Sequence, residues 1–103
     1  MGYLRDIIDD GEDSITKIAS EIITHSAFKE EIRRAAFNGE SSAEFCLDGM
    51  IETQLSESQL KAVIKKMTQN LSNENVTLND YEYEWSSDGR NEWVSAVRIE
   101  LEW

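Results

Sequence analysis

The sequence predicts an α+β fold in which N-terminal helices precede a β-α-β-β unit. Three observations predict it. Apolar residues recur every three or four positions through the first forty residues, as they do on one face of a helix. A short alternating segment, 43–47, precedes a helical segment that begins after Ser56. The last thirty residues then alternate between apolar and polar side chains, which is typical of a β-hairpin.

The apolar pattern of the N-terminal residues predicts two helices separated at a glycine. Residues 3–9 place their apolar side chains on one helical face and predict a short helix that ends near Gly11. Ser14 is expected to cap a second helix, because serine accepts hydrogen bonds from the free N–H groups of a first turn. The apolar stripe of that helix continues through Ile22.

A further helix is expected after a break in this stripe. The pattern falters at residues 24–26 and resumes in a different phase at Phe28. A bend, or a new helix capped by Ser26, is the simplest explanation. Asn38 and Gly39 follow as a helix-stop signal, because both residue types tolerate the left-handed conformation.

The first predicted strand is short and half-buried. Residues 43–47 alternate, with Ala43, Phe45 and Leu47 on one side and Glu44 and Cys46, followed by Asp48, on the other. Gly49 is expected to end this strand or to introduce a bulge into it.

The next helix has the clearest sequence signature in the chain. Ser56 and Gln59 form a capping-box pattern, and Glu57 with Lys61 is an i, i+4 ion pair in the favourable order. One apolar stripe runs along this helix, at Leu60, Val63, Ile64, Met67 and Leu71.

The C-terminal third predicts two strands joined by a turn at Asp88-Gly89. The apolar residues of the first of these strands fall into two sets that are out of step, and a bulge at Asn79-Asp80 would reconcile them. The two sets are Val76 with Leu78, and Tyr81 with Tyr83 and Trp85. The last strand is expected to alternate without interruption. One face is formed by Trp93, Ser95, Val97, Ile99, Leu101 and Trp103, and the opposite face by Val94, Ala96, Arg98, Glu100 and Glu102.

Chain connectivity then predicts a three-stranded mixed sheet with the strand order 1-3-2. A single helix between the first two strands makes them parallel if they share a sheet. The third strand can lie between them, antiparallel to the second, with the helices on one face of the sheet and the other face partly open. No proline and no linker interrupts the chain, so we expect one domain, 1–103, with a helical region (residues 1–40) and a β-α-β-β region (residues 41–103).

The composition is strongly acidic. The 103 residues include 21 Asp and Glu against 10 Lys and Arg, a formal net charge of −11, and the excess lies at the two ends of the chain. Such a field disfavours direct binding to nucleic acid or to an anionic membrane. No segment is long and apolar enough for a membrane span, and the acidic N-terminus does not resemble a secretory signal. The sequence therefore predicts a cytoplasmic protein.

The scarcity of cysteine and histidine limits the chemistry. With one Cys and one His, the chain cannot form an intrachain disulfide or a cysteine-based zinc site, and we predict no metal, no cofactor and no enzymatic activity. The acidic residues around Gly11 lack the calcium-loop pattern and are expected to form an acidic helix N-terminus. His25 is expected at a surface or a helix end. Cys46 is expected to be structural, because Glu44 and Asp48 beside it disfavour a reactive thiolate.

The candidate partner-binding site consists of acidic residues on the C-terminal strands, together with the terminal tryptophan. Side chains two apart on one strand face are separated by roughly 6.5–7 Å, so carboxylates on adjacent strands would form a small lattice. Like charges placed opposite each other cost stability, so the lattice either serves a basic partner or is a solvated face that prevents edge aggregation. The site is predicted at Asp80, Glu82, Glu84, Glu100, Glu102 and Trp103.

Residues 30–103 resemble a type of small α+β protein that is common in phage and mobile-element genomes. The features that carry the resemblance are the segments AAFNGESS, AEFCLDG, SESQLKAVIKKM and VSAVRIELEW. The resemblance implies a source and a fold, and it assigns no catalytic residue. Small acidic phage proteins include anti-CRISPR and anti-restriction inhibitors, some of which are DNA mimics, and this chain is similar to them in size and charge.

Two hypotheses for the function follow. The first is a small phage-type protein that binds and inhibits or modulates a host or defence protein, such as a nuclease, through its acidic surface, in the host cell cytoplasm. The partner would carry a basic surface of the kind that binds nucleic acid. The alternative is an accessory or structural protein that forms a homodimer through the apolar sheet face and Trp103.

Overall fold

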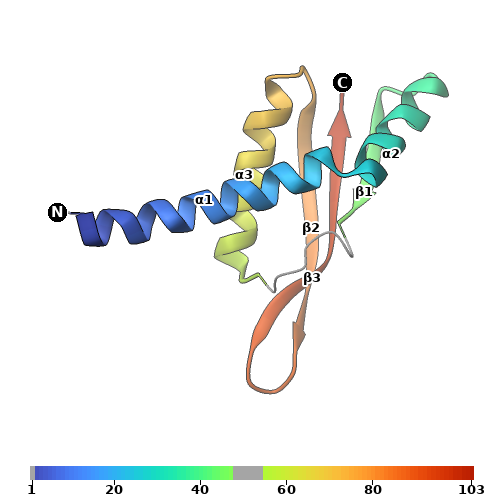
Figure 1. Cartoon of the computed structure of the whole chain (residues 1–103). Coiled ribbons are helices and arrows are strands. Elements are labelled where there is room, and N and C mark those ends of the chain that lie inside the picture. The colour runs from blue at the N-terminus through green and yellow to red at the C-terminus, as the bar shows by residue number, and fades with distance from the viewer. Residues whose placement is uncertain (1, 48–54) are drawn as a thin grey trace.

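The described residues form three helices and three strands, which follow one another along the chain. The computed structural model describes residues 2–47 and 55–103, with side chains from residue 11 onward. Figure 1 shows α1 crossing α3 and the strands and extending beyond α3 at the N-terminal end. The predicted α+β class is confirmed. The elements are α1 (Gly2–Thr24), α2 (Ser26–Phe37), β1 (Ser42–Cys46), α3 (Glu57–Ser72), β2 (Thr77–Ser87) and β3 (Glu92–Glu102).

The predicted division of the first helix at Gly11 is wrong. α1 continues through Gly11 and Ser14, so Ser14 is an interior residue and Glu12 and Asp13 lie within the helix, not in its first turn. A glycine inside a helix costs about 1 kcal/mol relative to alanine. Tertiary packing commonly outweighs such a local preference, and the apolar face of α1 packs against α3.

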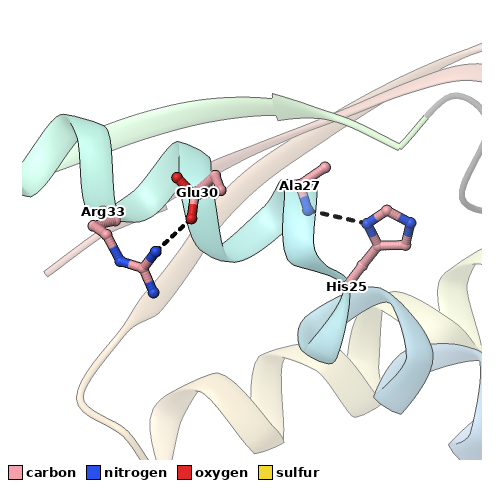
Figure 2. Close-up of polar contacts among 4 residues, drawn as sticks. All are labelled: His25, Ala27, Glu30 and Arg33. Atoms are coloured by element: carbon pink, nitrogen blue, oxygen red, sulfur yellow. Dashed lines mark hydrogen bonds and ion pairs between the residues drawn. The ribbon is translucent and has the colours of Figure 1, made fainter.

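The predicted break between the two N-terminal helices is confirmed, but its cap is His25, not Ser26 (Figure 2). The Nδ1 atom of His25 accepts a hydrogen bond of 3.1 Å from the backbone N–H of Ala27. This bond requires the imidazole tautomer with its proton on Nε2. Arg33 and Glu30 form an ion pair one turn further along α2 (Figure 2). His25 therefore has a structural role at a helix end, where the sequence placed it.

The other predicted helix boundaries are confirmed. Asn38 caps the end of α2, and Gly39 follows with a φ of +80°. Ser56 and Gln59 form the full capping box at the start of α3. The predicted apolar stripe of α3 is buried along its whole length, at Leu60, Val63, Ile64, Met67 and Leu71.

The sheet has the predicted strand order, β1-β3-β2, but it is not mixed. Both neighbouring pairs, β1 with β3 and β3 with β2, are antiparallel. β1 and β2 therefore run in the same direction, as the connection through α3 predicts. Because β3 lies between them, they do not form a parallel hydrogen-bonded pair. The long apolar alternation of β3 gives it the central position, where it is flanked on both sides.

Two bulges set the register of the hairpin, and only one was predicted. The bulge near Asn79 is confirmed, because Leu78 pairs with Leu101 whereas Asp80 pairs with Glu100. The second bulge lies in β3 at Ala96, which has a φ of +47°. The extra residue shifts the alternation of β3 by one position.

The bulge at Ala96 overturns the predicted uninterrupted face of β3. Val94 and Val97 are both buried although they are three residues apart, so both lie on the helix side of the sheet. Trp93 and Ser95 consequently lie on the opposite side from Val97. The predicted role of Gly49 falls outside the described residues.

The core lies between the helices and one face of the sheet. α2 contacts β1, and α3 contacts β2 and β3. We call this side of the sheet the covered face. Among the described residues it holds the buried strand side chains Val94, Val97, Ile99 and Leu101 and the partly buried Phe45, Leu78, Tyr81, Tyr83 and Trp103. None of the described helices is long and apolar enough to cross a membrane.

Candidate protein-binding face

The uncovered side of the sheet carries a dense group of carboxylates. These side chains alternate with those of the covered face, and all of them are exposed. Among the described residues, Arg98 is the one cation whose position in the strand register places it on this side. We call the surface the acidic face, and its carboxylates are Glu44, Asp80, Glu82, Glu84, Glu100 and Glu102.

Three carboxylates form a row across all three strands. Glu100 of β3 pairs with Glu44 of β1 on one side and with Asp80 of β2 on the other. Side chains that face each other directly in an antiparallel pair have Cβ atoms about 4.5–5.5 Å apart, and like charges in such positions are destabilising. The row therefore opposes folding.

The next row contains the cation of the face. Arg98 pairs with Cys46 on β1 and with Glu82 on β2. Interaction with Cys46 and the attraction of Glu44 and Glu82 raise the pKa of Arg98. Because the guanidinium is charged over the whole physiological range, it offsets part of the surrounding negative charge.

The two ends of the acidic face differ in chemistry. At one end, the bulge residue Asn79 donates a hydrogen bond of 2.6 Å from Nδ2 to Oε2 of Glu102. At the other end, Ser86 and Ser95 share a hydrogen bond of 2.7 Å between their hydroxyl groups. Ser86 pairs with Trp93, so this half-buried indole lies at the hairpin end of the acidic face.

The predicted site is thus brought together except for its aromatic member. The five predicted carboxylates lie on the acidic face, but Trp103 lies on the covered face, where it packs against the core. Its backbone N–H donates to the carbonyl of Ser41 at 2.9 Å. Trp93 lies on the acidic face instead. The bulge at Ala96 separates the two tryptophans, because it shifts the alternation between them.

Sequence reasoning misplaced Trp93 and did not foresee the strand pairings of Glu44 and Arg98. Trp93 was assigned to the wrong side for the reason just given. Glu44 was recognised as facing away from Phe45, but its position opposite Glu100 depends on strand register, which the sequence does not state. Arg98 was correctly placed on the same side as Glu100, and its role as the cation of the face follows from the pairing with Glu82.

Among the described residues, two open hollows lie on the acidic face. One of about 90 Å³ lies over the row of Glu44, Glu100 and Asp80, and one of about 490 Å³ lies beside the bulge, next to Glu82, Glu84 and Arg98. Small-molecule sites are usually clefts of about 300–1,000 Å³ that enclose most of the ligand, so the second hollow has the volume of such a site but is open to solvent. Within the described segments of the chain, no group of His, Cys, Asp and Glu side chains is arranged to hold a metal ion.

Cys46 is exposed on the acidic face, on the opposite side of β1 from Phe45, as the alternation of this strand predicts. It lies opposite Arg98, which the local sequence did not indicate, because the pairing joins residues 52 positions apart.

Comparison with known proteins identifies no relative: no protein-family model matches the chain, and neither the curated proteins nor the solved structures contain a match.

Proposed function

We propose that this chain binds a protein partner that carries a basic surface, and that its acidic face makes the contact. The observation that carries the proposal is the arrangement, among the described residues, of six carboxylates on one exposed sheet face with a single guanidinium between them. The like charges in the row through Glu100 destabilise the folded state, and these exposed side chains are not part of the core. A complementary partner would turn this repulsion into attraction.

The proposed partner is an enzyme or other protein that binds nucleic acid. Carboxylates on the acidic face are spaced about 4.5–5.5 Å across strands and about 6.5–7 Å along a strand. A groove lined with Lys and Arg for phosphates would meet a comparable density of negative charge here. The chain would then inhibit or modulate its partner by occupying the groove, and host or defence nucleases are the first candidates to test.

The alternative hypothesis, self-association through the apolar sheet face, meets an obstacle. That face is covered by α2 and α3, and Trp103 packs against the core. A homodimer would therefore need a different surface. The acidic face itself disfavours pairing with its own copy, because equal charges would meet.

The test is the association rate with candidate nucleases at low and at high salt. Electrostatic steering raises association rates by about 10- to 1,000-fold and weakens as salt rises. We expect a variant with Glu82, Glu84, Glu100 and Glu102 changed to Gln to associate at least tenfold more slowly at low salt. In a competition assay, the unchanged chain should also displace the nucleic-acid substrate from the nuclease.

A matched control changes the same number of charges elsewhere. Glu12, Asp13, Glu21 and Glu74 are exposed and lie outside the sheet. Their conversion to the corresponding amides gives the same net charge as the first variant, and we expect less than a threefold change in rate. Equal losses in the two variants would show that net charge alone is at work, and the proposed function would then be wrong.

A further inference from the structure

The outer edge of β2 has an unusual combination of properties. β2 is an edge strand eleven residues long with β3 as its one neighbour in the described sheet. Figure 1 shows the turn end of the hairpin extending beyond the helices. A long edge strand presents unpaired backbone groups that can accept another strand.

The hydrogen bonds of β3 show which residues of β2 point their backbone outward. In an antiparallel pair, residues alternate between those that bond to the partner strand and those that point away from it. The N–H of Val94 donates to the carbonyl of Leu55 at 2.9 Å, so the backbone N–H and C=O groups of Val94 point away from β2. Trp85 is paired with Val94, so its backbone groups point away from β3, toward the open edge.

Two further contacts give the same assignment. The N–H of Leu47 donates to the carbonyl of Val97 at 2.8 Å, so Val97, and by alternation Ile99, point toward the β1 side. Tyr81 pairs with Ile99 and so points outward as well. Its N–H donates at 2.8 Å to Oδ1 of Asp80, which occupies this position of the edge. The alternation leaves Tyr83 and Trp85 with backbone groups directed outward.

The side chains on either side of this edge are chemically distinct. Glu82 and Glu84 belong to the acidic face. On the covered face, the rings of Tyr83 and Trp85 meet edge to face at a centroid distance of 5.8 Å. Trp85 is 51% exposed. Tyr83 is partly buried against the core, and burial together with a hydrogen bond to the Glu57 carboxylate, at the start of α3, raises the pKa of Tyr83.

We propose that the edge of β2 between Glu82 and Trp85 accepts an extended, basic segment of a partner protein as a fourth strand. The backbone of that segment would pair with Tyr83 and Trp85. Its alternate side chains would be Lys or Arg beside the two glutamates and apolar beside the aromatic rings. This inference deepens the proposed function, on which it relies for the positive charge of the partner.

Charge argues against a second copy of this chain as the occupant. Pairing two β2 edges would bring the Glu82 and Glu84 side chains of one copy beside those of the other. Like charges opposite each other in a sheet are destabilising, whereas a strand with alternating Lys would form opposite-charge pairs at the same positions. The exposed indole of Trp85 supplies an apolar anchor of the type enriched in interfaces.

The test uses three nine-residue peptides and the full chain. The first alternates Lys and Val, the second has the same composition in a non-alternating order, and the third is the first with backbone N-methyl groups on the residues that would pair. We expect the alternating peptide to bind at least tenfold more tightly than the other two. We also expect it to slow hydrogen exchange at the amides of Tyr83 and Trp85.

Variants of the chain locate the binding. Trp85→Ser should weaken the alternating peptide at least fivefold, whereas Phe37→Ser should not. Phe37 is a matched control, since its side chain is 90% exposed and lies at the end of α2. Equal binding of the N-methylated peptide, or protection at β1 instead of β2, would overturn the inference. Concentration-dependent protection of Tyr83 and Trp85 without peptide would show that a second copy occupies the edge, and would also overturn it.

The experiment separates this inference from the proposed function. Salt-sensitive binding of all three peptides with equal affinity would retain the acidic face as a binding surface and reject the fourth strand. A second outcome is binding that requires backbone pairing but is unaffected both by salt and by the change of Glu82 and Glu84 to Gln. This outcome would retain the edge contact. It would reject both the proposed electrostatic function and the basic nature of the segment.

Discussion

The two faces of the sheet are built from alternate residues of the same strands, yet they obey different physical constraints. On the covered face, Ile99 and Leu101 are buried against the helices. On the acidic face, Glu100 lies between them in sequence and opposes two other carboxylates. The first arrangement stabilises the fold, and the second opposes it. The composition of the acidic face therefore needs an explanation other than stability.

The bulge at Ala96 determines which residues of β3 belong to the covered face and which to the acidic face. Before Ala96 the covered face takes the even-numbered Val94, and after it the odd-numbered Val97 and Ile99. A positive φ is unfavourable for alanine, which lacks the conformational freedom of glycine. The strand adopts it nonetheless, and the outcome is that Val94 joins the core and Trp93 joins the acidic face.

The largest expected effect breaks the covered face. Ile99→Ala should lower the free energy of unfolding by about 2–5 kcal/mol, because it removes buried methyl groups and leaves a cavity. Urea denaturation measures the change. On the acidic face, Cys46→Ala should change stability by no more than about 0.5 kcal/mol. Similar losses in both variants would contradict the division into a packed and an unpacked face.

The helical cover of the sheet provides the next test. Ser56→Ala removes the cap of α3 and should cost about 1 kcal/mol of stability. Ser58→Ala makes the same chemical change within the first turn, away from the capping position, and should be close to neutral. Thermal unfolding followed by circular dichroism compares the two. If Ser58→Ala cost as much, the capping interaction would not be the cause.

The acidic face should respond in the opposite direction. Glu100→Gln removes the central charge of the carboxylate row and should raise stability by about 0.2–1 kcal/mol. Glu74→Gln, after the end of α3, removes a charge outside the sheet and should have a smaller effect. High salt should reduce the gain, since it screens exposed charges. A loss of stability in Glu100→Gln would show that the row is not repulsive.

The smallest expected effect concerns pH and the hairpin turn. The N–H groups of Asn91 and Arg90 donate to Oδ1 of Asp88 and lower the pKa of this carboxyl. Because the pKa is lower in the folded state, the stabilisation is fully present above the unfolded value of about 4 and is lost as the pH falls through the folded value.

We therefore expect Asp88→Ala to lower the unfolding midpoint slightly at neutral pH, and the difference from the natural chain to shrink in acid. Asp88→Asn keeps an oxygen that can accept both bonds and should show a smaller deficit at neutral pH. A deficit of Asp88→Ala that stays constant from neutral pH into strong acid would argue against the carboxylate as its source.

Local patterns predicted the elements that depend on local chemistry. The capping box at Ser56 and Gln59, the stop at Asn38-Gly39 and the buried stripe of α3 follow from spacing within a few turns. The bulge near Asn79 was visible because two apolar sets on one strand were out of phase. The predictions failed where a distant contact outweighed a local signal, as in α1, which passes through Gly11.

The carboxylates of the candidate site were predictable because alternation along a strand is also a local pattern. Strict alternation places Glu82 and Glu84 on one side of β2, and Glu100 and Glu102 on one side of β3, whatever else the chain does. The assignment of Trp93 failed because the alternation of β3 is broken once, and an alanine in a β pattern gives no sign of a bulge.

The sequence by itself determined which residues have apolar partners and which carry charge, and hence that one side of the sheet is covered and the other negative. The tertiary structure alone decided which charges meet. Glu44 faces Glu100, and Cys46 faces Arg98, because β3 runs antiparallel between β1 and β2 in one register. Register is a property of two strands packed against a common core, and a single strand does not encode it.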